Sequence, residues 1–166
     1  MPTRVFTLDT AWSAFYPGVM VHASACPPQM ADYYLREAVR EFCRKSTLWR
    51  EDLTAMDLTE DVTHYTLSSK AGTRIVMPTH IEVRDGDTTT VLDPEVERSV
   101  DEITGDWRTQ GVDGKFIVPT PDLLILTYAP SETVTDGINI VAALQPSAGA
   151  SQVPAFLYND WHEWIV

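Results

Sequence analysis

Two pairs of carboxylates are the residues whose types and spacing could do acid–base chemistry. Asp85 and Asp87 flank Gly86, and Asp101 is followed directly by Glu102. Such pairs suit general acid and base catalysis, because one carboxyl can hold a proton while the other accepts one. The surrounding pattern predicts a tight turn for the first pair and a solvated helix face for the second. A small acid-pair hydrolase is therefore the least favoured function.

Residues for other chemistry are not assembled into a recognisable site. His162–Glu163 lacks the second histidine of a helical zinc site. The sequence holds no phosphate-binding loop, dinucleotide motif or nucleophile elbow. Cys43 falls at an apolar helical position, which predicts a core thiol, and Cys26 precedes two prolines in a loop. We predict no catalytic residue, cofactor or metal site.

Composition excludes several classes of protein. The 166 residues include 24 acids and 12 bases, giving a net charge of −12. A protein that binds nucleic acid without sequence preference needs a surface rich in Lys and Arg, and so does a protein that binds an anionic membrane. The net negative charge argues against both classes. Apolar runs fall short of the ~18 residues that a spanning helix needs, and the N-terminus lacks a signal-peptide pattern. These features predict a soluble protein inside the cell.

The charge is unevenly distributed along the chain. Residues 26–50 carry five bases and three acids, whereas residues 51–166 carry six bases and twenty acids. This asymmetry can orient a subunit against a partner or against another copy of itself. The alternative is that these charges face water and maintain solubility.

Periodicity predicts an α+β fold. Steps of three and four between apolar residues predict an amphipathic helix over residues 26–46, beginning near Pro27 and Pro28. The apolar face would hold Met30, Ala31, Tyr34, Leu35, Ala38, Val39, Phe42 and Cys43. Residues 48–146 are predicted to be mainly antiparallel β, with about six to eight strands. Aromatic and apolar residues over 153–166 predict a C-terminal helix.

Smaller elements complete this prediction. Residues 1–25 have no clean period and are expected to form an extended arm. Asp85–Asp87 predicts a two-residue hairpin turn, because Gly86 can adopt a positive φ. Asp93 and Pro94 predict the start of a short helix over residues 95–103. The expected organisation is an arm over 1–25 and one α+β domain over 26–166.

Several sequence blocks occur in an informative order. They are Cys26-Pro-Pro-Gln-Met30, Leu35-Arg-Glu-Ala-Val-Arg-Glu-Phe-Cys-Arg-Lys-Ser46, Trp49-Arg-Glu51, Pro121-Asp-Leu-Leu-Ile-Leu126, Ala143-Leu-Gln-Pro146 and Val153-Pro-Ala-Phe-Leu-Tyr-Asn-Asp-Trp161. This order resembles the head-to-tail connector adaptor proteins of tailed bacteriophages, particularly short-tailed phages of the podovirus type. The resemblance covers most of residues 20–166, and it rests on packing motifs.

The resemblance implies a structural virion protein that is not an enzyme. Such adaptors form a ring of about twelve copies between the portal and the tail, and the ring lines the channel for genome ejection. The expected partners are other copies of the chain, the portal protein, and a tail or nozzle protein, with tail fibres as a further possibility. DNA would pass through without sequence-specific binding, and no membrane is involved. The chain would be assembled in the bacterial host cytoplasm and located in the virion. Relatives continue the last helix beyond the position of residue 166.

Seven residues are the candidate interface positions. Arg36, Arg40 and Arg44 are predicted to face an acidic surface of a neighbour, and Trp161 and Trp164 to dock on a partner. Trp12 and Phe15 in the arm are further candidate anchors, although aromatic residues can equally pack in the chain's own core. Another tail-associated subunit, in tail-fibre attachment or as a tail terminator, is the main alternative function.

Overall fold

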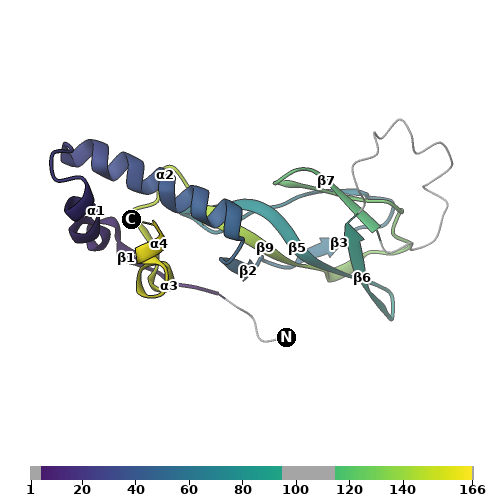
Figure 1. Cartoon of the computed structure of the whole chain (residues 1–166). Coiled ribbons are helices and arrows are strands. Elements are labelled where there is room, and N and C mark those ends of the chain that lie inside the picture. The colour runs from purple at the N-terminus through teal and green to yellow at the C-terminus, as the bar shows by residue number, and fades with distance from the viewer. Residues whose placement is uncertain (1–4, 95–114, 166) are drawn as a thin grey trace. The chain divides into compact units, whose positions relative to one another are not determined.

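The computed structural model describes residues 5–94 and 115–165, which fall into two compact units (Figure 1). Unit 1 comprises Met1–Glu51, Lys70–Val76 and Ala143–Val166, and unit 2 comprises Asp52–Ser69 and Met77–Ala142. Each unit is therefore built from segments far apart in the sequence. The sequence instead predicts an arm over residues 1–25 and one domain over 26–166.

The helices in the described residues belong to unit 1, whereas most of the described strands lie wholly or partly in unit 2. The elements of unit 1 are β1 (Leu8–Ala11), the 3₁₀ helix η1 (Trp12–Phe15), α1 (Tyr16–His22), α2 (Pro28–Ser46), β10 (Gln152–Pro154), α3 (Ala155–Asn159) and α4 (His162–Ile165). Those of unit 2 are β3 (Met56–Leu58), β4 (His64–Thr66), β6 (Thr88–Pro94), β7 (Lys115–Thr120) and β8 (Leu123–Leu126). Strands β2 (Arg50–Asp52), β5 (Thr73–Asp85) and β9 (Val134–Pro146) have residues in both units.

The predicted α+β class, with a long N-terminal helix, a central antiparallel β domain and a C-terminal helix, is wrong. Strands account for 41% and helices for 28%, so the fold is mostly β. The N-terminal part begins with strand β1 and the seven-residue helix α1. At the C-terminus, residues 152–154 form β10, and two short helices replace the one predicted over 153–166. Asp160 and Trp161 form a turn between them, and α3 ends where the Asp160 N–H donates to the Phe156 carbonyl at 3.0 Å.

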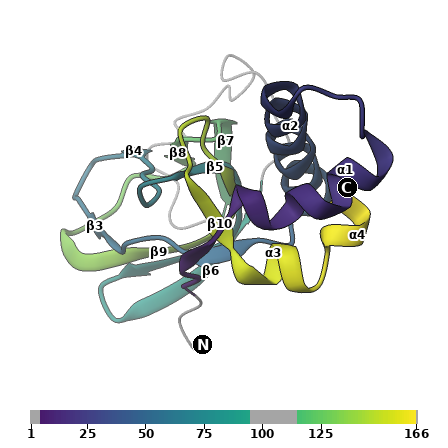
Figure 2. The same cartoon turned by 90° about the vertical axis from the view of Figure 1, so that its left-hand side faces the viewer.

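Local signals account for the bounds of α2. Pro28 occupies the first turn, where its missing N–H is not needed. Thr47 adopts a left-handed conformation with φ of 50° and donates its N–H to the Cys43 carbonyl, which ends the helix. The buried stripe holds Ala31, Leu35, Val39 and Cys43. In Figure 2, α1, α3 and α4 are grouped beside α2, and contacts of α1 and α4 with α2 agree with this view.

The segment predicted as an extended arm is folded into unit 1 over its described residues. β1 pairs antiparallel with β10, and Leu8 lies opposite Pro154. η1 and α1 follow directly, and Trp12 and Phe15 are buried. Pairing between segments so distant in sequence leaves no local signature, which is why periodicity did not predict it.

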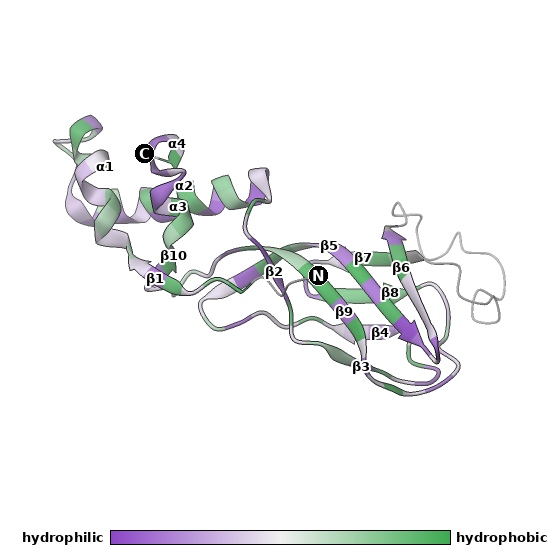
Figure 3. Ribbon diagram, turned by 90° about the horizontal axis from the view of Figure 1, so that it is seen from below, coloured by the Kyte–Doolittle hydropathy of each residue, from purple (hydrophilic) through white to green (hydrophobic). Residues whose placement is uncertain are grey.

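Eight strands form the larger sheet in the order β2-β9-β5-β6-β7-β8-β4, with β3 also paired to β9. β6 and β7 pair in parallel, with Asp93 opposite Lys115 and Pro94 opposite Phe116. The pairs β3–β9, β4–β8, β5–β6 and β7–β8 are antiparallel. Hydrophobic residues run along β8 and β9 (Figure 3). Their buried members, including Leu124, Leu126 and Ile138, contribute to the core of unit 2.

The hairpin turn predicted at Asp85–Asp87 is confirmed. β5 ends at Asp85, β6 begins at Thr88, and these two residues are register partners. Gly86 has a φ of +61°, which residues with a Cβ rarely adopt. The predicted helix over residues 95–103 lies outside the described residues. None of the helices in the described ranges has the length and apolar character needed to span a bilayer.

Candidate functional site

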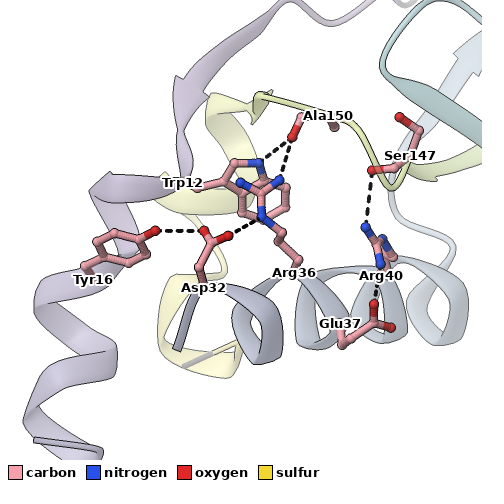
Figure 4. A network of polar contacts seen from close by, with 8 residues as sticks. All are labelled: Trp12, Tyr16, Asp32, Arg36, Glu37, Arg40, Ser147 and Ala150. Carbon is pink, nitrogen blue, oxygen red and sulfur yellow. Dashed lines mark hydrogen bonds and ion pairs between the residues drawn. The ribbon is translucent and has the colours of Figure 1, made fainter. Parts of the chain in front are cut away.

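A polar network runs along one flank of α2, facing residues 147–150 (Figure 4). Arg36 donates from Nε to Asp32 Oδ2 at 2.7 Å and from Nη1 to the Ala150 carbonyl at 2.7 Å. Its guanidinium also lies 4.7 Å from the centre of the Trp12 ring. Arg36 is therefore occupied by contacts within its own chain.

The same network joins η1 and α1 to α2. Trp12 donates from Nε1 to the Ala150 carbonyl at 2.8 Å, and the Tyr16 hydroxyl donates to Asp32 Oδ1 at 2.7 Å. The Arg36 hydrogen bond is the main reason that the pKa of Asp32 is lowered, and it outweighs the opposing effect of burial. Donation to Asp32 is the main reason that the pKa of Tyr16 is raised.

This network makes stability depend on pH. The pKa of Asp32 is lower in the folded chain, so its contacts stabilise the fold above the unfolded value of about 3.9 and are lost as pH falls through the folded value. We expect Asp32→Asn to destabilise the chain at neutral pH and to reduce the further loss of stability below about pH 4. Urea unfolding across this pH range measures both effects.

The matched control is Asp160→Asn, which removes an exposed carboxylate of unit 1 outside this network. An Asp32→Asn profile parallel to that of the wild type over the acid range would contradict the role given to Asp32.

Trp12 and Phe15 are not available as anchors for a partner. Trp12 is 3% exposed and Phe15 is 1% exposed. Phe15 packs edge-on against Tyr158, with ring centres 5.1 Å apart. Their three-residue spacing in a 3₁₀ turn brings both rings to one side, where unit 1 covers them. Together with Arg36, they hold unit 1 together and are removed from the candidate interface.

Arg40 and Arg44 border an open groove of about 270 Å³ in unit 1. We name it the arginine groove; it is lined by Glu37, Arg40, Glu41, Arg44, Arg74, Gln145, Pro146, Ser147 and Ala148. Arg40 pairs with Glu37 and donates to the Ser147 carbonyl at 3.4 Å, while Arg44 pairs with Glu41. Sequence reasoning missed Arg74, because it lies on β5 and reaches this groove only through the fold.

The two C-terminal tryptophans differ in their surroundings. Trp161 is partly buried and packs on Phe42 of α2, with ring centres 5.6 Å apart. Trp164 on α4 is 78% exposed. Trp164 therefore remains a candidate anchor, whereas much of Trp161 is used inside unit 1.

The exposed face of α2 carries large apolar side chains that the helical pattern placed in the core. Met30 and Tyr34 were predicted on the buried face, yet they are 48% and 59% exposed. Tyr33 is also exposed, and its ring lies edge-on to that of Tyr34 at 5.4 Å. The buried stripe of α2 consists only of Ala31, Leu35, Val39 and Cys43. Met30 and Tyr34 therefore lie at the edge of this stripe. We name Met30, Tyr33 and Tyr34 the tyrosine face.

Unit 1 also contains a buried ion pair. Glu51 is 2% exposed, and Lys70 Nζ lies 2.6 and 2.7 Å from its two carboxylate oxygens. Trp49 donates from Nε1 to Glu51 Oε1 at 2.7 Å, and Lys70 also donates to the Phe6 carbonyl. The carboxylate of Glu51 and the ammonium of Lys70 are each other's partners, so we infer a structural role: the cluster holds the segments around residues 6, 51 and 70 together.

The residues considered for chemistry are not gathered into a catalytic site in the described part of the chain. Asp87 is exposed at the hairpin, and Asp85 accepts a hydrogen bond from the Ser131 hydroxyl at 3.0 Å. The pair Asp101 and Glu102 lies outside the described residues. Burial raises the pKa of the Cys43 thiol to about 12, which confirms the prediction of a core cysteine. Over residues 5–94 and 115–165, no cluster of three or more metal-ligating side chains is present.

Charge divides between the two units about as unevenly as it divides along the sequence. Unit 1 has eight bases and seven acids, whereas unit 2 has four bases and seventeen acids. Unit 1 is therefore close to neutral, with its bases concentrated on α2, and unit 2 carries the acidity of the chain.

No protein-family model matches this sequence, and a search of curated proteins found no match.

Proposed function

We propose that this chain is a structural virion protein, a head-to-tail adaptor that assembles as a ring between the portal and the tail of a tailed phage. Two independent features support the proposal. One is the ordered set of sequence blocks that resembles the podovirus-type adaptors. The other is the distribution of exposed apolar side chains, which carries the structural part of the argument.

The tyrosine face is the observation on which the proposal depends. Met30, Tyr33 and Tyr34 stand at i, i+3 and i+4 on α2, so they form one continuous strip on its exposed side. Trp164 and Val21 add further exposed apolar side chains to unit 1. Tyrosine, tryptophan and methionine are enriched at protein interfaces, where their apolar bodies are buried on binding. Unit 1 therefore has the character of a docking unit.

The acidity of unit 2 fits the same function. An acidic channel wall repels the DNA phosphates, so the genome slides past without being held. In this proposal unit 1 docks on the portal through the tyrosine face, and unit 2 faces the channel or the tail. The partners are further copies of the chain, the portal protein and a tail or nozzle protein. The role is structural and requires no catalytic residue.

We expect the alanine variant Tyr33→Ala/Tyr34→Ala to bind the portal at least about tenfold more weakly than the wild type, because interface tyrosines commonly contribute more than ~1 kcal/mol each. Light scattering of the chain with purified portal protein of the same virus measures the complex. Val91→Ala is the matched control, because Val91 is an exposed apolar residue of unit 2. Its portal binding is expected to equal that of the wild type.

A wild-type chain that remains indifferent to the portal would contradict the adaptor proposal. Binding to tail fibres or to the end of the tail tube would then favour the alternative of another tail-associated subunit.

A further inference from the structure

The arginine groove of unit 1 presents cationic groups suited to carboxylates. Arg40 and Arg44 have glutamate partners on α2, but Arg74 has no carboxylate partner among the residues that the structure describes. Arg74 is exposed, and it faces the groove from β5. A guanidinium binds a carboxylate through two parallel hydrogen bonds, so an arginine-lined groove selects acidic groups.

Unit 2 has a surface of the opposite sign around residues 130–136, where the chain enters β9. We name it the acidic end; its seven acids are Asp57, Glu60, Asp61, Asp85, Asp87, Glu132 and Asp136, and one base, Arg84, lies beside them and donates to the Thr135 carbonyl at 2.8 Å.

Hydrogen bonds bring the separate segments of the acidic end together. Asp57 Oδ1 accepts from the Asp136 N–H at 2.9 Å, and the Glu60 N–H donates to Thr133 Oγ1 at 3.1 Å. The Asp61 N–H donates to the Pro130 carbonyl at 3.1 Å. The β5–β6 turn joins through Asp85, which accepts from Ser131. The acidic end is therefore one surface assembled from three parts of the chain.

We propose that the arginine groove of one copy binds the acidic end of unit 2 in a second copy. The inference rests on the proposed function for its premise that copies of this chain associate. The two surfaces are different patches on the same molecule, so the contact is heterologous. Each bound copy leaves one groove and one acidic end free, and repetition of the contact closes a ring or extends a filament. The charge difference between the units provides the complementarity.

Two copies also repel each other, because each carries a net charge of −12. The Debye length is about 30 Å at ~0.01 M salt, about 8 Å at ~0.15 M and about 3 Å at ~1 M. Low salt leaves the long-range repulsion unscreened, and high salt weakens the short-range pairing in the groove. Association is therefore expected to be strongest near ~0.15 M salt. An apolar contact would instead strengthen steadily with salt.

The test uses two charge reversals at exposed positions, Arg74→Glu in the groove and Glu132→Arg in the acidic end. Each variant alone is expected to self-associate at least about tenfold more weakly in sedimentation velocity experiments. Mixed together, they should form at least one-to-one dimers, because the intact groove of the Glu132→Arg copy can bind the intact acidic end of the Arg74→Glu copy. Arg50→Glu and Asp122→Arg are matched controls, since they make the same charge changes at exposed positions outside the two surfaces.

Three results would overturn the inference. They are wild-type copies that do not associate at any of these salt concentrations, reversals that behave like their controls, or mixed variants that fail to form dimers. Portal binding is measured separately. If the reversals leave self-association unchanged while the portal is still bound, the groove contact is wrong and the adaptor proposal stands. If the mixed dimers form but the wild-type chain does not bind the portal, the adaptor proposal is wrong and the groove contact between copies is supported.

Discussion

Trp12→Ala is expected to lower the free energy of unfolding by about 3–5 kcal/mol, which is the usual cost of truncating a buried tryptophan. The indole is 3% exposed, so its removal leaves a cavity in unit 1. Two further contacts are lost with it. Arg36 no longer stacks on the ring, and the Ala150 carbonyl loses one of its two donors.

Trp164→Ala provides a matched control for the same side-chain change. Trp164 is 78% exposed, so its truncation is expected to cost less than about 0.5 kcal/mol. Urea unfolding followed by tryptophan fluorescence measures both variants, and four of the five tryptophans lie in unit 1. Equal destabilisation by the two variants would mean that residues 8–22 are the loose arm expected from sequence.

Lys70→Met is expected to destabilise the chain by about 3 kcal/mol, because it leaves the buried Glu51 carboxylate without its cation. The Trp49 N–H would remain as a donor to Glu51, but one hydrogen bond from an uncharged donor does not offset the burial of a charge. Lys70 is about one-third exposed, which places the expected cost at the lower end of the range for buried pairs.

Two further variants separate the charge effect from packing. The double variant Glu51→Gln/Lys70→Met removes both charges and keeps an oxygen for Trp49, so it is expected to recover much of the lost stability. Lys45→Met breaks an exposed pair with Glu41 and is expected to cost less than about 0.5 kcal/mol. Equal losses for Lys70→Met and Lys45→Met in urea unfolding would show that the Glu51 pair is not buried in solution.

The features of the fold that can be predicted from sequence are those that depend on residues close together in the chain. The bounds of α2 follow from Pro28 and Thr47, and the β5–β6 hairpin follows from Gly86. The start of α2 at Pro28 and the turn at Gly86 can be inferred from residue type, whereas the left-handed φ of 50° at Thr47 cannot, because β-branched residues rarely adopt it. The burial of Cys43 follows from helical spacing in the same way.

The candidate surfaces could not be predicted in this way. Arg36 was expected to meet a neighbour, but its partners Trp12 and Ala150 lie 24 and 114 residues away along the chain. Arg74 joins Arg40 in one groove only because β5 passes near α2. Tyr34 was expected in the core, but the position of the packing elements leaves it exposed.

Sequence alone therefore determined the net charge and the local signals at Pro28 and Gly86. Only the tertiary structure decided which aromatic residues are buried, that Arg74 faces the arginine groove without a carboxylate partner among the described residues, and which carboxylates gather at one end of unit 2. The physical reason is that burial and charge pairing depend on contacts between distant segments. Such contacts form when β1 meets β10 and when Lys70 reaches Glu51, and no local pattern encodes them.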